Sequence, residues 1–143
     1  VQALNVNKPC EVVTGCAFDG NWGALPADGD TSGEFYLLSY LYERIEQAGA
    51  GKFEADEGIG IATVGELAEA ARKVCSMPLH EVKASNNVHP EDPLYFCLDL
   101  SYIHALLTEG FGITSSFKMA KKFDINDVKY EAAWSLGAAL EML

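Results

Sequence analysis

The chain has 143 residues, 49% of them hydrophobic, which is enough to bury the core of one compact domain. Its formal net charge of -11 argues against partners that need a basic surface, such as nucleic-acid polymers and anionic membranes. Each apolar run is far shorter than the roughly 20 residues that cross a bilayer, so we expect no transmembrane segment in this chain.

The first predicted element is a helix over about 33–48. Its apolar residues recur at helical spacing and are Phe35, Leu38, Tyr42 and Ile45. Thr31 and Ser32 are suitable capping residues at its start, and Gly49 follows its end. We therefore expect one continuous helix here.

A second helix is predicted to begin after Thr63, because Thr63 and Glu66 form a T-x-x-E capping box. Its apolar stripe consists of Val64, Leu67, Ala68, Ala71, Val74 and Cys75. Pro78 is predicted to end this helix, since proline cannot continue it.

The polar, proline-rich segment 85–93 is predicted to be a loop, and a third helix follows it. The predicted buried stripe of the third helix consists of Leu94, Leu98, Tyr102, Ala105 and Leu106. Gly110 stands where we expect a left-handed C-terminal cap.

Imperfect alternation over 117–123 predicts one strand, an edge or a short central one, with Phe117 and Met119 on one face. A last helix is predicted from about Lys129 onwards, and Gly137 on it permits close approach to another element. So many helices with so little strand indicate an α/β protein with an incomplete sheet, whose partner strands are missing.

The cysteines of the chain are Cys10, Cys16, Cys75 and Cys97. Their spacing does not match a zinc knuckle, and their even number favours two disulfides and an oxidising compartment. The alternative is four reduced core cysteines in a cytosolic protein. His80, His89 and His104 are dispersed, so no metal site is predicted in this chain. Walker, Rossmann and Gly-x-Ser-x-Gly motifs do not occur in the sequence.

Four segments together resemble the apyrases, the nucleoside triphosphate diphosphohydrolases. They are CAFDGNW at 16–22, VCSMPLHEV at 74–82, YFCLDLSYIHALLTEGFG at 95–112 and EAAWSLGAALEML at 131–143. They occur in the family's order and extend over most of the chain, so the resemblance is to the C-terminal portion of an apyrase. The family's phosphate-binding glycine loops and catalytic glutamate lie upstream of this portion. Because the chain begins at Val1 in a segment typical of the middle of a protein, we expect it to be part of a longer protein.

The resemblance implies an α/β, helix-rich fold: the second lobe of a two-lobed, actin-like (ribonuclease H-like) ATPase. Residues 1–127 would belong to that second lobe. Residues 128–143 would form a C-terminal helix that returns to the missing first lobe and packs on it. The resemblance also pairs the cysteines sequentially, Cys10 with Cys16 and Cys75 with Cys97.

The resemblance further implies roles for individual residues. Tyr42 and Phe96 match the aromatic positions that stack on the nucleotide base, with phenylalanine replacing the family's tyrosine at 96. The alternative is that both are core aromatics. Trp134 and Gly137 would support the cleft near the phosphate-binding loops, or Trp134 would simply pack between the lobes. Asp99 is interpreted as structural.

By resemblance, the complete protein hydrolyses the terminal phosphates of nucleoside tri- and diphosphates, with Ca2+ or Mg2+ bridging the phosphates. We expect no metal on this chain alone, no hydrolysis by it, and a need for a partner lobe or larger assembly. Its location would be secreted, lumenal or at the cell surface. The alternatives are a non-catalytic, apyrase-like scaffold subunit and another actin-fold phosphatase such as an exopolyphosphatase, against which the paired cysteines count.

Overall fold

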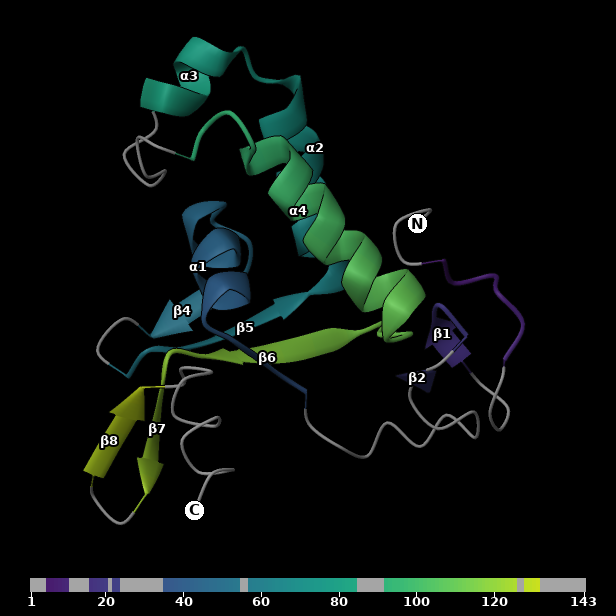
Figure 1. The fold of residues 1–143 in the computed structure, drawn as a ribbon. Coiled ribbons are helices and arrows are strands. Elements are labelled where there is room, and N and C mark those ends of the chain that lie inside the picture. The colour runs from purple at the N-terminus through teal and green to yellow at the C-terminus, as the bar shows by residue number, and fades with distance from the viewer. Residues whose placement is uncertain are drawn as a thin grey trace.

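In the described part of the chain, helices lie on one face of a mixed β-sheet, which makes the architecture α/β (Figure 1). The computed structural model describes residues 5–10, 16–20, 22–23, 35–54, 57–84, 92–125 and 128–131. The strands are β1 (Cys16–Phe18), β2 (Trp22–Gly23), β3 (Tyr36–Leu38), β4 (Lys52–Glu54), β5 (Ile59–Thr63), β6 (Ser116–Ala120), β7 (Lys122–Ile125) and β8 (Val128–Glu131). The helices are α1 (Tyr40–Gln47), α2 (Val64–Ser76), α3 (Leu79–Ala84), α4 (Phe96–Ala105) and the π-helical turn η2 (Leu106–Gly110).

The main sheet has four strands in the order β3-β6-β5-β4. β3 runs parallel to β6, with Leu37 opposite Met119, whereas β5 is antiparallel to both β6 and β4. The prediction of one strand over 117–123 is only partly right. Its first part is the short central strand β6, which ends at Ala120, and Lys122 and Phe123 belong to β7 of a separate two-stranded sheet.

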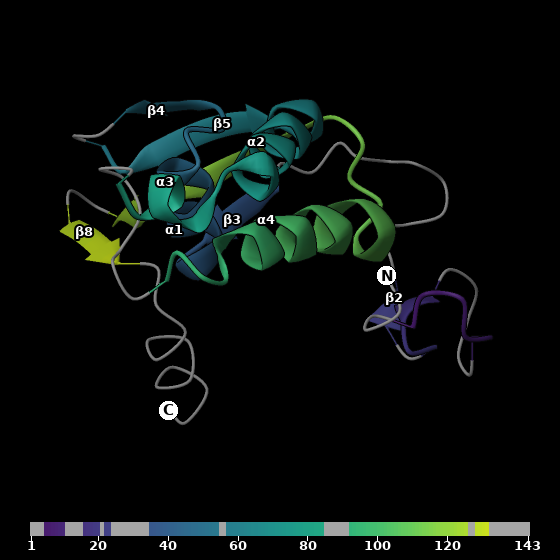
Figure 2. The same ribbon diagram turned by 90° about the horizontal axis from the view of Figure 1, so that it is seen from above.

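The core lies between the inner face of this sheet and the helices α1, α2 and α4. Viewed from above, α1 and α2 overlie the strands and α4 runs beside them (Figure 2). Side chains from every layer are fully buried in the core. The largest are Tyr42, Ile45, Leu67, Phe96, Leu100, Ile103, Leu107, Phe117 and Met119. Gly60 on β5 permits this packing, because a Cβ there would lie 2.8 Å from the ring of Phe53.

The outer face of the sheet carries apolar side chains too. Tyr36, Leu38, Ile59 and Ile61 all point to this face and are exposed. A shallow hollow of about 390 Å³ lies here between β4, β5 and the side chains of Tyr36 and Lys118. The described helices lie on the opposite side of the sheet (Figure 1).

The prediction of one helix over 33–48 is wrong for its first half. β3 occupies Tyr36–Leu38 and α1 begins only at Tyr40. Leu37 points into the core, whereas its neighbours Tyr36 and Leu38 point outward, as in a strand. The backbone hydrogen bonds to β6 also require an extended chain, and this tertiary pairing outweighs the local helical pattern. Ser39, with φ of 52°, makes the sharp change of direction between strand and helix. The predicted caps Thr31 and Ser32 lie outside the described residues.

The second helix is confirmed as α2. Thr63 caps it and the full capping box is present: the Glu66 N–H donates to Thr63 Oγ1 at 3.1 Å, and the Thr63 N–H donates to Glu66 Oε2 at 2.7 Å. Pro78 follows its end and introduces α3, which the sequence patterns did not predict. The β4–β5 hairpin was not predicted either, although Ile59, Ile61 and Thr63 alternate with the inward Gly60 and Ala62 of β5.

The third helix exists as α4, but its predicted buried face is wrong. Phe96, Leu100 and Ile103 are buried, whereas the predicted stripe residues Leu98 and Tyr102 are 63% and 46% exposed. α4 is apolar on both faces, so periodicity alone could not choose between them.

The predicted cap at Gly110 is also wrong. Gly110 belongs to η2, where a Cβ would lie 2.6 Å from the Phe18 ring, and Gly112 takes the left-handed conformation with φ of 69°.

The prediction of a C-terminal helix over 128–143 is wrong for its first four residues. The expected terminal helix from 128 begins instead as the strand β8, which pairs antiparallel with β7, Lys122 facing Glu131. The remainder of that segment, with Trp134 and Gly137, lies outside the described residues. None of the helices in the described part is long and apolar enough to span a bilayer.

Candidate functional site

The N-terminal end of α4 lies beside α1, and backbone hydrogen bonds shape the turn that precedes α4. The N–H of Tyr95 donates to the carbonyl of Asp92 at 3.1 Å. The N–H of Asp99 donates in turn to the carbonyl of Tyr95 at 2.8 Å. Tyr95 is therefore held between the two aspartates, and both aspartates contact Arg44 of α1.

Arg44 is the buried centre of this contact, with only 10% of its side chain exposed. Its Nη2 lies 2.9 Å from Asp92 Oδ2, and its Nε lies 3.4 Å from Asp99 Oδ2. Its Nη1 donates to Gln47 Oε1 at 2.9 Å. The guanidinium carbon lies 5.0 Å from the centroid of the Tyr40 ring, within the range of a cation–π contact. We call Tyr40, Arg44, Asp92 and Asp99 the Arg44 cluster.

The electrostatics of the Arg44 cluster keep the guanidinium charged and the phenol neutral. Burial acts to lower the pKa of Arg44, but the hydrogen bond to Asp92 and the contact with Tyr40 outweigh it, so the pKa is raised. Burial raises the pKa of Tyr40, and its hydrogen bond to Asp99 raises it further. Because two carboxylates meet one guanidinium, the cluster holds an excess of negative charge.

Tyr42 and Phe96, the residues that resemblance assigns to base stacking, are both buried, each with 1% exposed. The Tyr42 ring packs edge-on against Phe53, with centroids 5.7 Å apart, and its hydroxyl donates to Glu46 Oε1 at 3.1 Å. Burial raises the pKa of Tyr42 to about 12, with the charge of Glu46 adding to the effect. In this arrangement neither ring offers a free face to a base, and their base-binding role stays a prediction.

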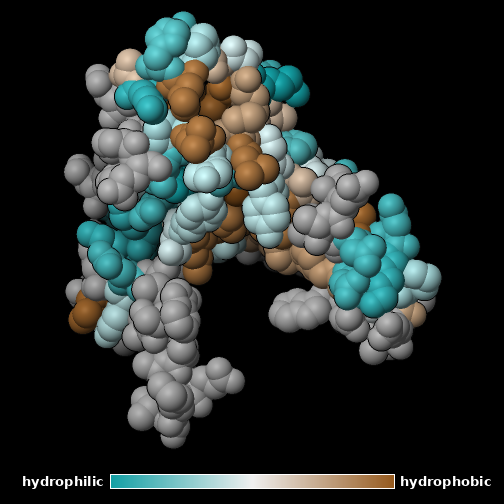
Figure 3. Space-filling model, turned by 45° about the horizontal axis from the view of Figure 1, so that its top comes forward, coloured by the Kyte–Doolittle hydropathy of each residue, from teal (hydrophilic) through white to brown (hydrophobic). Residues whose placement is uncertain are grey.

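Two exposed aromatic residues, Tyr40 and Tyr95, lie close in sequence to the predicted base-stacking residues Tyr42 and Phe96. Tyr40 is 42% exposed and Tyr95 is 59% exposed, and both belong to or adjoin the Arg44 cluster. Figure 3 shows apolar side chains, in brown, gathered near the top of the molecule. Sequence reasoning missed Tyr40 and Tyr95, but a signal existed: a tyrosine lies four residues before Arg44, one helical turn away.

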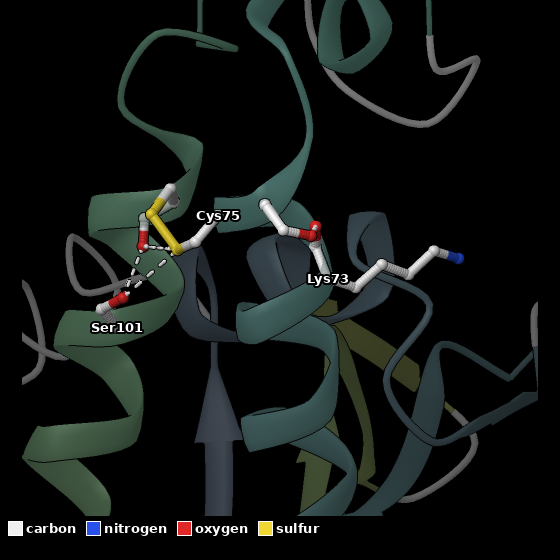
Figure 4. Close-up of a disulfide and its surroundings, with 5 residues drawn as sticks. Lys73, Cys75 and Ser101 are labelled. Carbon is white, nitrogen blue, oxygen red and sulfur yellow. Dashed lines mark hydrogen bonds between the residues drawn. A yellow bond between two sulfur atoms is a disulfide. The ribbon is translucent and has the colours of Figure 1, made fainter.

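The structure contains the predicted disulfide between Cys75 and Cys97, which joins the end of α2 to the first turn of α4 (Figure 4). Ser101 Oγ donates to the Cys97 carbonyl at 2.8 Å and lies 3.7 Å from Cys75 Sγ. Cys10 is disulfide-bonded as well, while the side chain of its predicted partner Cys16 lies outside the described part. The α4 end of the Arg44 cluster is thus covalently tied to α2.

The full chain, residues 1–143, matches the sequence model of the GDA1/CD39 (nucleoside phosphatase) family. The chain belongs to this family. A probable apyrase 1 from Oryza sativa subsp. japonica is 31% identical over 145 residues, which cover 99% of this chain and 29% of the rice protein. Apyrase 1 from Arabidopsis thaliana is 34% identical over 146 residues, or 99% of this chain and 30% of the plant protein.

A human relative, nucleoside diphosphate phosphatase ENTPD5, is 33% identical over 111 residues, which cover 78% of this chain and 23% of that protein. The chain therefore spans less than a third of the length of these nucleoside phosphatase relatives. Within the segments described by the structure, no three His, Cys, Asp or Glu side chains form a group that could hold a metal ion. The Ca2+ or Mg2+ expected in the complete protein stays a prediction, and we derive no chemical step through it. Trp134 and Gly137, the predicted cleft supports, lie beyond the described ranges.

Proposed function

We propose that this chain is the C-terminal portion of an apyrase and forms the base-binding side of its nucleotide cleft. The complete protein would hydrolyse nucleoside tri- and diphosphates. The observation that carries the base-binding proposal is the pair of exposed rings, Tyr40 and Tyr95, which the buried Arg44 joins through its contacts with Tyr40 and Asp92. Family membership supports the nucleotide as the substrate class.

Exposed aromatic rings suit a nucleoside base for a physical reason. A planar base gains stacking energy of about 1–3 kcal/mol per ring without needing specific hydrogen bonds. The net charge of -11 does not favour phosphate binding, so charge neutralisation of the triphosphate would come from elsewhere in the complete protein. In the complete enzyme, Ca2+ or Mg2+ would supply that charge.

The proposal places this chain in the second lobe of an actin-like ATPase, with the segment after β8 returning to the first lobe. Its mixed sheet with helices on one face agrees with an α/β lobe. The disulfide between Cys75 and Cys97 supports an oxidising location, secreted, lumenal or at the cell surface. The chain by itself would not release phosphate from ATP or ADP.

The scaffold alternative has its own supporting observation. Leu94 and Leu98 on the solvent side of the α4 segment are 64% and 63% exposed, which suits docking as well as ligand binding. In that case the chain would serve as a non-catalytic subunit of an assembly.

The test is kinetic and uses the longer protein that contains this chain. Tyr40→Ala and Tyr95→Ala should each raise KM for ATP and ADP by roughly ten- to a hundredfold while leaving KM for inorganic tripolyphosphate unchanged, because tripolyphosphate has no base to stack. Tyr130→Ala is the control, since Tyr130 on β8 is a tyrosine as exposed as Tyr40, 41% against 42%.

Two further variants separate the observed pair from the pair that resemblance assigns. Tyr42→Leu and Phe96→Leu remove the rings but keep these core positions apolar, and they should leave KM for ATP near that of the unmodified protein. If these two raise KM for ATP and the exposed pair do not, base stacking belongs to Tyr42 and Phe96. If all four leave it unchanged, the base does not bind here. Absence of any turnover by the complete protein would favour the scaffold.

A further inference from the structure

We propose that Arg44 is a positioning residue that sets the affinity for the nucleoside part of the substrate. It would do so by holding Tyr40 and Tyr95 in fixed relation, without touching the nucleotide itself. The inference rests on the proposed function, since it concerns the same two rings.

Arg44 connects three separate parts of the chain. It contacts Gln47 on its own helix, Asp92 in the turn before α4, and Asp99 in the first turn of α4. The two aspartates flank Tyr95 in sequence, and both are hydrogen-bonded to its backbone. A movement of Arg44 would therefore reach the backbone of Tyr95 indirectly, through the side chains and then the main chains of Asp92 and Asp99.

The same guanidinium also determines the position of Tyr40. The ring of Tyr40 lies against the guanidinium at 5.0 Å, and Tyr40 stands one helical turn before Arg44 on α1. The two exposed rings come from segments more than fifty residues apart, and the Arg44 cluster is a polar link between them. Only 10% of the Arg44 side chain is exposed, so the groups packed around it leave little room for alternative side-chain positions.

Direct binding of substrate by Arg44 does not fit the same geometry. Its two terminal nitrogens already contact Gln47 and Asp92. Its Nε is buried without a hydrogen-bond partner in the described part of the chain, 3.4 Å from Asp99 but poorly aligned with it. With two carboxylates beside it, the site would repel a phosphate group. Arg44 can thus act on the nucleotide only through the rings it holds.

Arginine suits this role better than lysine. Its planar fork contacts two carboxylates and stacks on an aromatic ring at once, whereas a lysine ammonium is a single compact charge. A buried polar cluster with an unpaired donor is also a poor way to gain stability, because an apolar cluster of equal volume often serves as well. The cluster is better explained by the fixed geometry it imposes.

The experiment measures KM and kcat of the longer protein with ATP and with tripolyphosphate. Arg44→Lys should raise KM for ATP by roughly tenfold, leave KM for tripolyphosphate within about twofold, and leave kcat within about twofold, because only base positioning is disturbed. Asp92→Asn, which weakens the link from the other side, should act in the same direction by less. Arg72→Lys on the exposed face of α2 is the matched control and should change nothing.

The outcomes are distinguishable. Unchanged KM for ATP in Arg44→Lys, while Tyr40→Ala and Tyr95→Ala raise it, overturns the inference and leaves the base-binding proposal intact. Unchanged KM in all three variants overturns the base-binding proposal itself. Equal loss with ATP and tripolyphosphate in Arg44→Lys means a general structural role and overturns the inference. Asp92→Asn keeps the question decidable if Arg44→Lys fails to fold.

Discussion

The helices α2 and α4 lie side by side and are joined by a disulfide, yet they are built on opposite principles. α2 is amphipathic: Leu67 and Ala71 are buried, and charged residues such as Arg72 face solvent. α4 buries Leu100 and Ile103 and also exposes apolar residues on its other side. A helix with one polar face and one apolar face packs with its polar face toward solvent, but α4 has no distinct polar face.

This difference shows when a periodic pattern of apolar residues predicts the buried side of a helix and when it predicts only the helix. For α2 the pattern predicts both the helix and its buried side, because only one side is apolar. For α4 the pattern predicts a helix and leaves two candidate faces. Leu98 and Tyr102 on the outer face contribute little to the core of the described part, so they are available for contacts with another molecule or lobe.

The sharpest test of the comparison substitutes leucines on the two faces of α4. Leu100 is fully buried, so Leu100→Ala should lower the free energy of unfolding by about 2–5 kcal/mol. Leu98→Ala is the matched control on the exposed face and should cost within about 0.5 kcal/mol. Urea denaturation followed by circular dichroism measures both. A larger loss for Leu98→Ala would mean that the outer face is the buried one in the folded protein.

The disulfide that joins the two helices should have the next largest effect. Replacing both Cys75 and Cys97 by serine should cost about 3 kcal/mol, since the bridge closes a loop with a sequence separation of 22. Ser76→Ala, one residue from Cys75, is the control. It removes only the exposed hydrogen bond from the Ser76 hydroxyl to the Lys73 carbonyl and should cost at most about 1 kcal/mol. An unchanged urea midpoint for the double variant would contradict the prediction.

The smallest effect concerns the start of α2. Thr63→Ala removes the capping hydroxyl and should cost about 1 kcal/mol. Hydrogen bonds from the Thr63 backbone and side chain lower the pKa of Glu66. A lowered pKa means that its contribution is present above the unfolded-state pKa and is lost as pH falls through the folded-state pKa. The cost of Thr63→Ala should therefore shrink under acid conditions, as thermal unfolding at neutral and acid pH would reveal. A cost that grows in acid would refute it.

Local signals explain which parts of the fold the sequence could predict. The capping box at Thr63 and Glu66 is complete within four residues, so α2 needed no information from distant segments. β3 depends on pairing with β6, about eighty residues away, and short-range periodicity therefore suggested a helix there. β5 was missed because the inward residues Gly60 and Ala62 are small, which weakens the hydrophobic alternation.

In the candidate site, too, only the features set by nearby residues could be predicted from the sequence. Family resemblance drew attention to Tyr42 on α1 and Phe96 on α4, the two helices that also carry residues of the Arg44 cluster, because those motifs are contiguous in sequence. The Arg44 cluster could not be predicted, since Arg44 and Asp92 meet only when α1 packs on α4. Exposure is likewise a property of the packed molecule, so the sequence could not distinguish Tyr40 from Tyr42.

The outer face of the sheet has a consequence for handling this chain in solution. Apolar side chains such as Ile59 and Ile61 are exposed there, on a molecule with a net charge of -11. Like charge keeps separate copies apart at low ionic strength, but salt shortens the range of that repulsion to about 10 Å at 0.1 M. Isolated copies should consequently stay dispersed in dilute buffer and associate through this face as salt is added. The usual practice of adding salt to keep a protein monomeric would have the opposite effect on this one.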